Sequence, residues 1–265
     1  MISISHESPV ELFEMSLMYN DYQYCLVHLM EENSVYEEWF LEKFKARCPN
    51  GEIMLDNSIF ELGTAFDSVK YASWVDKIKP NFYIVPDALE EAEETMSKYE
   101  AFTNDYTDLP GAKIGVVQGK TWSELKECYR YMSDKCDYIA ISFDYSYYNI
   151  TGNGSTKLEK FAYGRQHFID RLINEGIWNW RKPHHLLGCS VAKEFKHYKI
   201  TNIRSLDTSN PVVAGLLGYR YNDDLGLDHK PSTLLADLIN AKPTEDQIED
   251  IKYNTSMFKK IIYND

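Results

Sequence analysis

A repeat of 31 residues is the feature that most restricts what this chain can fold into. Short apolar runs end in a polar side chain at Asp56, Asp87 and Gln118; Asp56 and Asp87 are 31 residues apart, and so are Asp87 and Gln118. The intervals carry the apolar spacing of helices. Strands that alternate with helices at this period form a parallel sheet. The sequence therefore predicts an α/β protein.

The number of strands favours a closed barrel. A (β/α)8 TIM barrel needs eight strands, and either Ile2–His6 or Val212–Leu217 could supply the eighth. An open, doubly wound sheet is the alternative, but no GxGxxG motif follows the first strand. We predict one barrel domain over 1–265. The seven strands predicted from apolar runs cover 22–30, 51–56, 82–85, 113–117, 138–143, 184–188 and 203–207.

Helix-start signals mark several of the intervening segments. Asp67 is a predicted N-cap, and capping boxes begin at Thr121 and Thr244. The last helices are predicted over about 232–240 and 245–262. The segment 144–155 is rich in tyrosine and glycine and has no helical stripe, so we expect a loop that could close over a substrate.

Composition narrows the class of protein. A formal net charge of −13 weighs against a protein coated with nucleic acid. No apolar run approaches the roughly 18 residues that suggest a membrane span, and the amino terminus lacks the pattern of a signal peptide. Five cysteines, an odd number without close pairs, favour reduced thiols. We expect a cytoplasmic protein that does not associate with membranes.

One window is basic in spite of the overall charge. Between Arg181 and Arg204 the only acid is Glu194. A solvated face and an edge that contacts phosphates are both compatible with this pattern. The basic residues of the window are Arg181, Lys182, Lys193, Lys196, Lys199 and Arg204, together with His184, His185 and His197.

The polar strand ends predict a shared site. In a barrel the carboxyl ends of the strands meet at one mouth, which is where the chemistry of this fold lies. We expect Asp56, Asp87, Gln118, Gly188 and Asp207 there. Each alone could be a turn or a cap, and Asp56 in particular could cap the next turn. Three acids and an amide together predict an active site.

At these positions the sequence resembles the tRNA-guanine transglycosylase superfamily. It is most similar to the short phage and bacterial enzymes, called DpdA-like, that insert 7-deazaguanines into DNA. The resemblance covers about 50–220, and its short motifs occur in the family order. They are Leu55-Asp-Asn-Ser-Ile-Phe-Glu61, Val85-Pro-Asp87, Val116-Val-Gln-Gly119, His185-Leu-Leu-Gly188 and Ser205-Leu-Asp-Thr-Ser209.

The resemblance implies a role for each motif residue. Asp207 matches the nucleophile that attacks C1′ of the nucleoside and holds the sugar as a covalent ester. Asp56 matches the acid/base that takes a proton from the incoming base. Two carboxylates with these roles follow the logic of retaining glycosyl transfer. Residues implied to contact the base are Asp87, Gln118, Gly188, Leu187 and Asn57, with Phe60 either stacking on it or packing in the barrel-top core.

Two departures from the family pattern bear on the substrate. No cysteine follows Cys189, so the zinc site of the tRNA enzymes is missing, and we expect neither a zinc subdomain nor another cofactor. Two glycines of the family motif are replaced within Asp56-Asn-Ser-Ile-Phe60. These departures favour DNA over tRNA as the nucleic-acid partner and a preQ0-like 7-deazaguanine as the incoming base.

Other functions stay open at the level of sequence. The alternatives are the same chemistry on tRNA, an inactive barrel that serves as a binding subunit, and an unrelated small-molecule barrel enzyme. No lysine for a Schiff base lies at a strand end, which weighs against an aldolase. A homodimer is open as the oligomeric state.

Overall fold

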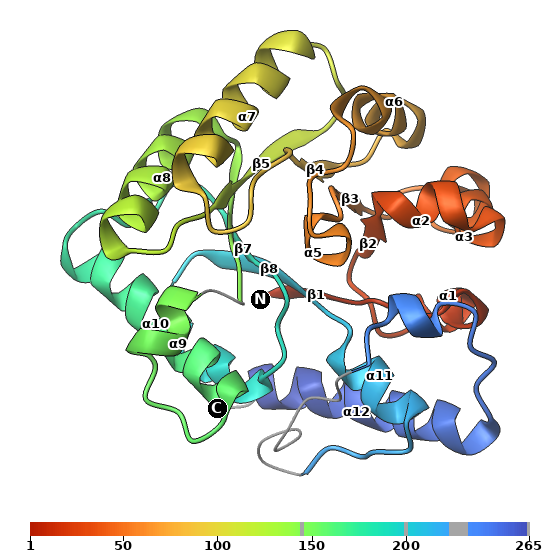
Figure 1. Ribbon diagram of the computed structural model, residues 1–265. Coiled ribbons are helices and arrows are strands. Elements are labelled where there is room, and N and C mark those ends of the chain that lie inside the picture. The colour runs from red at the N-terminus through yellow and green to blue at the C-terminus, as the bar shows by residue number, and fades with distance from the viewer. Residues whose placement is uncertain (144–145, 199–200, 223–232, 264–265) are drawn as a thin grey trace. The chain divides into compact units, whose positions relative to one another are not determined.

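The computed structural model describes residues 1–265 except 144–145, 199–200, 223–232 and 264–265. Its strands form one eight-stranded sheet in the order β1-β8-β7-β6-β5-β4-β3-β2, and helices alternate with them (Figure 1). The fold is the predicted (β/α)8 TIM barrel. Its strands are β1 (Ser3–His6), β2 (Gln23–Leu26), β3 (Ile53–Asp56), β4 (Phe82–Ile84), β5 (Ala112–Val117), β6 (Tyr138–Ile141), β7 (His184–Leu186) and β8 (Ile203–Thr208).

The amino terminus supplies the eighth strand. Strand β1 pairs in parallel with β8, with Ile4 opposite Leu206 and Ser5 opposite Asp207. The other candidate, Val212–Leu217, is wrong, because it lies mostly in the helix α11 (Asn210–Leu216). Pro211 occupies the first turn of that helix, where its fixed φ and missing N–H suit a helix start.

The described chain divides into two compact units. The first comprises 1–21, 143–180 and 186–265, and the second comprises 22–142 and 181–185. In the second unit aromatic rings fill the inner side of the sheet. Tyr24 of β2 stacks on His185 of β7 at 6.0 Å between ring centroids, although four strands separate them in the sheet order. Tyr138 contacts both His185 and Phe82, so the sheet of this unit is rolled around an aromatic core.

Helices of the second unit begin largely where the sequence predicts. The side chain of Asp67 accepts a hydrogen bond from the Lys70 N–H, and Thr121 forms the predicted capping box with Glu124. A turn of π-helix interrupts the helical segment after β2. The helical elements are α2 (Val27–Glu32), α3 (Ser34–Glu38), η2 (Trp39–Lys43), α4 (Phe44–Arg47), α5 (Ile59–Leu62), α6 (Ser68–Ile78), α7 (Ala92–Asp105) and α8 (Trp122–Lys135).

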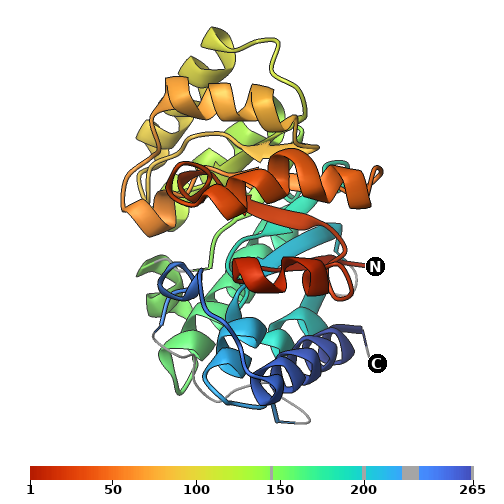
Figure 2. The same cartoon turned by 90° about the vertical axis from the view of Figure 1, so that its right-hand side faces the viewer.

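In the first unit, α11 packs on β1 and on α12. Figure 2 shows α11 in light blue beside α12 in dark blue. Thr244 and Gln247 form the predicted capping box of α12. None of the described helices is both long and apolar enough to cross a membrane. The elements are η1 (Val10–Leu12), α1 (Phe13–Ser16), α9 (Ser146–Thr151), α10 (Lys157–Asn174), η3 (Ala192–Tyr198), α11, η4 (Ala236–Leu238) and α12 (Glu245–Tyr263).

Two segments differ from the prediction. The expected loop over 144–155 contains the helix α9, and positions 144–145 lie outside the described residues. Tyr148 of α9 is fully buried, and a Cβ on Gly164 of α10 would lie 2.4 Å from its Cα. The missing side chain at Gly164 therefore lets the two helices pack closely. The helix expected over 232–240 is a single 3-10 turn at Ala236–Leu238 in the part that is described.

A buried histidine makes the stability of the first unit depend on pH. His6 is enclosed by Tyr19 and Phe258, and neither ring nitrogen has a hydrogen-bond partner among the described residues. Burial, assisted by Lys259, lowers the pKa of His6 to about 3. As pH falls, His6 is therefore protonated in the unfolded chain at a higher pH than in the folded chain. The stability due to neutral His6 is complete above pH 6.5 and is lost as pH falls toward 3, at about 1.4 kcal/mol per pH unit.

We expect His6→Leu to flatten this acid dependence. Urea denaturation between pH 6 and pH 4 should show a slope about 1.4 kcal/mol per pH unit smaller than that of wild type. His167→Gln is the control, because His167 is exposed on α10. An unchanged slope in His6→Leu would show that His6 is not the group that titrates.

Candidate active site

The predicted site residues fall into two groups, one in each unit. The second unit contains Asp56, Asn57, Phe60, Asp87 and Gln118. The first unit contains Leu187, Gly188 and Asp207.

Asp87 is the centre of a hydrogen-bonded cluster at the carboxyl ends of β3, β4 and β5. The Asn57 amide nitrogen donates to Oδ1 of Asp87 at 2.8 Å, and the Gln118 amide nitrogen donates to Oδ2 at 2.6 Å. The three strands are parallel neighbours, so their ends lie side by side. The structure thus brings together three residues that the sequence predicts as base contacts.

Backbone groups fix the orientation of the two amides. The Asn57 oxygen accepts from the Ile59 N–H at 3.0 Å, and the Gln118 oxygen accepts from the Glu90 N–H at 2.7 Å. Each amide therefore turns its nitrogen toward the carboxylate. Burial raises the pKa of Asp87, and the hydrogen bonds from Gln118 and Asn57 oppose that shift.

The cluster can still accept hydrogen bonds from a ligand. An ionised carboxylate has about four acceptor positions; the two amides take one on each oxygen of Asp87, and its own backbone N–H takes a further one. A carboxylate acceptor of this kind suits an N–H donor of a ligand. Asp87 is only 2% exposed, so a ligand that reaches it must be almost completely desolvated.

Asp56 is the last residue of β3 and is half-buried. Its Oδ2 accepts from the Tyr24 hydroxyl at 2.6 Å, and its Oδ1 accepts from the Ser58 N–H at 2.5 Å. The bond from the Ser58 N–H shows that Asp56 does cap the turn after β3, as its position in the sequence allowed. Tyr24 is a further contact that a turn does not require, and its ring is held by the stacking on His185. The carboxylate is therefore fixed from two directions.

Asp207 lies on β8 and is 5% exposed. Both of its carboxylate oxygens lie 3.2 Å from the Gly188 nitrogen, so the N–H is shared between them. Gly188 follows β7 with φ of 61°, a left-handed conformation that glycine adopts without strain. The loop after β7 thereby holds the predicted nucleophile.

Phe60 is 52% exposed on the short helix α5. The alternative that it packs in the barrel-top core is therefore wrong. An exposed aromatic face four residues after Asp56 is available to stack on a base, and stacking stays a prediction.

The basic window is not one continuous patch of charged side chains. His184 and His185 are fully buried, and Lys199 lies outside the described residues. Lys182 donates to the carbonyl of Cys136, just before β6, and thus lies at the amino-terminal end of the strands, as does Arg181, which precedes β7. Lys193 and Lys196 lie on η3, after the carboxyl end of β7. Lys193 pairs with Glu159, whereas Lys196 is exposed.

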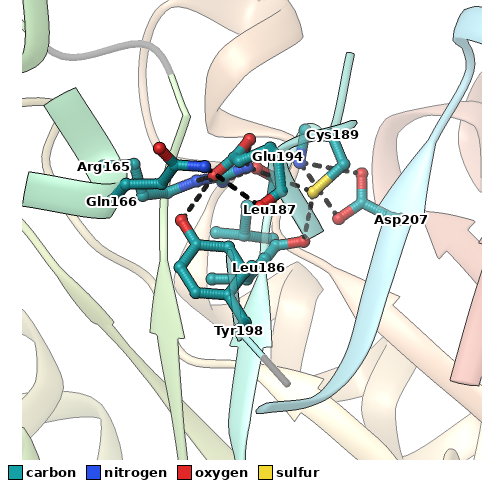
Figure 3. A network of polar contacts seen from close by, with 9 residues as sticks. Arg165, Gln166, Leu186, Leu187, Cys189, Glu194, Tyr198 and Asp207 are labelled. Atoms are coloured by element: carbon teal, nitrogen blue, oxygen red, sulfur yellow. Dashed lines mark hydrogen bonds and ion pairs between the residues drawn. The ribbon is translucent and has the colours of Figure 1, made fainter. Parts of the chain in front are cut away.

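The sequence reasoning missed a buried ion pair beside Asp207 (Figure 3). The Arg165 guanidinium donates to both carboxylate oxygens of Glu194, at 2.8 and 2.9 Å, and both side chains are completely buried. The Tyr198 hydroxyl donates to Glu194 at 2.7 Å. The signal for this pair was present, because Arg165 lies four residues from both Phe161 and Ile169 and so interrupts the buried stripe of α10.

The described residues contain no group of three or more His, Cys, Asp or Glu side chains that could hold a metal ion. The chain matches none of the family models and none of the curated proteins with which it was compared.

Proposed function

We propose that this protein is a base-exchange glycosyltransferase that replaces guanine in DNA with a preQ0-like 7-deazaguanine. The Asn57–Asp87–Gln118 cluster is the observation that carries this proposal. It is a buried carboxylate held by two oriented amides, and a carboxylate is the natural acceptor for the N–H donors of a flat base. A base in a duplex must be extruded to reach such a residue.

The chemistry divides into two steps. The Asp207 carboxylate attacks C1′ of the target nucleoside while the bond from C1′ to N9 of guanine breaks, so a covalent sugar ester forms and guanine leaves as its N9 is protonated. The incoming 7-deazaguanine then loses its N9 proton to Asp56 and attacks C1′, which breaks the ester and frees Asp207. The same carboxyl serves both bases, as the acid when guanine leaves and as the base when the new one enters.

The test of the proposed function is the nucleoside content of DNA and tRNA after reaction. Purified protein is incubated with preQ0 and either a guanine-containing duplex or bulk tRNA, and the digested nucleosides are measured by mass spectrometry. We expect the deazaguanine nucleoside in DNA only. Its appearance in tRNA alone would favour the tRNA alternative, and its absence from both would refute base exchange with this donor.

DNA binding gives a separate prediction about Lys196. Each neutralised phosphate contributes about 0.9 to the slope of log affinity against log salt. We expect Lys196→Glu to weaken duplex binding and to reduce that slope by about 1, with turnover at saturating DNA nearly unchanged. Fluorescence anisotropy at several salt concentrations measures both quantities.

Arg204→Glu is the matched control. Arg204 is exposed in the same unit and belongs to the same basic window, but it lies at the amino-terminal end of β8, away from Asp207 at the other end of that strand. An equal loss of slope in both variants would point to non-specific charge effects and would contradict a phosphate contact at Lys196.

A further inference from the structure

The peptide group between Leu187 and Gly188 connects the buried ion pair to Asp207. Its carbonyl oxygen accepts from the Arg165 guanidinium at 2.8 Å, and its N–H is the one that Asp207 shares. Arg165 and Asp207 thus bind opposite ends of a single amide plane (Figure 3).

Arg165 itself is held on several sides. Besides Glu194 and Leu187, its guanidinium donates to the Cys189 sulfur at 3.2 Å. The Gln166 side chain donates to the Glu194 carbonyl at 3.1 Å, which ties α10 to η3 a second time. The fork of the guanidinium therefore fixes the loop after β7 at two points, Leu187 and Cys189.

We infer that Arg165 is a positioning residue for Asp207, acting through the Leu187–Gly188 peptide. This inference deepens the proposed function, because it names the group that keeps the nucleophile aligned with C1′. Asp207 meets the loop after β7 through the Gly188 N–H and through its own carbonyl, which accepts from the Cys189 N–H at 2.9 Å. A loop held at Leu187 and Cys189 is thereby held against the residue that reacts.

The charge on Arg165 strengthens this arrangement. A cation at the carbonyl end polarises an amide, and a polarised N–H is a better donor to a carboxylate. The planar fork of arginine reaches Glu194, Leu187 and Cys189 together, whereas the single ammonium of lysine cannot reproduce that geometry. The competing explanation is that the ion pair only joins α10 to η3. It would then help to specify the fold and have no effect on how Asp207 is placed.

Rapid-quench kinetics of Arg165→Lys separates the two explanations. The probe is a guanine-containing duplex oligonucleotide without added base, and the covalent adduct is measured over time. A misplacement of about 1 Å can cost about 10²-fold in rate. We expect the rate constant of adduct formation to fall by about 10²-fold, while the amplitude, which counts competent molecules, and the KM for the duplex stay near wild type. A merely structural pair would lower the amplitude and leave the rate constant unchanged.

Arg171→Lys is the control, because Arg171 is exposed on the same helix and pairs with Glu175. It should leave both rate and amplitude unchanged. If Arg165→Lys does not fold, Tyr198→Phe takes its place, since it removes one hydrogen bond to Glu194 and keeps the ion pair. A reduced rate constant with full amplitude is again expected.

Hydrogen exchange at the Gly188 amide tests the inference without any substrate. The N–H should be protected in the wild type and should exchange faster in Arg165→Lys, or in Tyr198→Phe where that variant is used. Unchanged exchange in the folded variant would overturn the inference even if base exchange is established. A wild-type protein that forms no adduct would refute the proposed function, and the exchange rates would then decide the positioning role by themselves.

Discussion

Asp207→Asn should abolish both base exchange and the covalent adduct. The amide keeps an oxygen that can accept from the Gly188 N–H, so the loop after β7 stays in place, but it cannot form the ester with C1′. Removing a nucleophile of this kind costs several orders of magnitude, and we expect at least about 10⁴-fold in kcat. Release of labelled guanine from DNA measures the loss.

The control for this change is Asp170→Asn. Asp170 lies on α10 in the same unit and pairs with the exposed His197, so the substitution removes a carboxylate without touching β8. It should retain wild-type activity. Guanine release by Asp207→Asn within tenfold of wild type would exclude Asp207 as the nucleophile.

Asp56→Asn should slow both half-reactions by about 10² to 10⁴-fold, the usual contribution of a general acid or base. In the proposed mechanism the leaving and the incoming base exchange their proton with the same carboxyl, so both steps should slow. A duplex that contains 7-methylguanine provides the diagnostic, because this base already carries a positive charge and leaves without protonation. We expect adduct formation from that duplex at nearly the wild-type rate.

Asp76→Asn is the matched control, since Asp76 is an exposed carboxylate on α6 of the same unit. It should behave as wild type with both duplexes. If Asp56→Asn forms the adduct slowly from guanine and from 7-methylguanine alike, then Asp56 does not act by proton transfer, and a role in holding the turn at Ser58 would explain its effect.

The fold could be predicted from the sequence because a period repeats. A constant interval between Asp56, Asp87 and Gln118 requires parallel neighbouring strands, and such strands place their polar ends together. The identity of the eighth strand could not be predicted from apolar content, because Val212–Leu217 is the more continuously apolar run, whereas Ile2–His6 alternates apolar and polar residues. The pairing of β1 with β8 in the structure identifies Ile2–His6 as the source of the eighth strand. Pro211 is a local signal for a helix start, and it argues against a strand at Val212–Leu217.

The orientation of side chains within the site could not be predicted, because it depends on contacts that the spacing of apolar and polar residues does not indicate. The sequence predicted that Asn57, Asp87 and Gln118 would be close, but the direction of each amide follows from the N–H groups of Ile59 and Glu90. Those bonds come from the segments that follow β3 and β4, where no apolar period indicates the backbone conformation.

The ion pair beside Asp207 could not be predicted for the same reason. Arg165 in an apolar stripe indicates a buried partner, but Glu194 is 29 residues away in a segment without regular spacing. Helix α9 was missed for a related reason. Its Tyr148 packs against Gly164, a tertiary contact that supplies the stability its short sequence lacks.

The covalent adduct can be mapped to a single residue. Wild-type protein is incubated with a guanine-containing duplex in the absence of added base, denatured, and digested with nuclease and protease, and the modified peptide is sequenced by mass spectrometry. We expect a deoxyribose-linked nucleotide on Asp207. A nucleotide on another side chain, or guanine exchange that proceeds with no adduct at all, would contradict it.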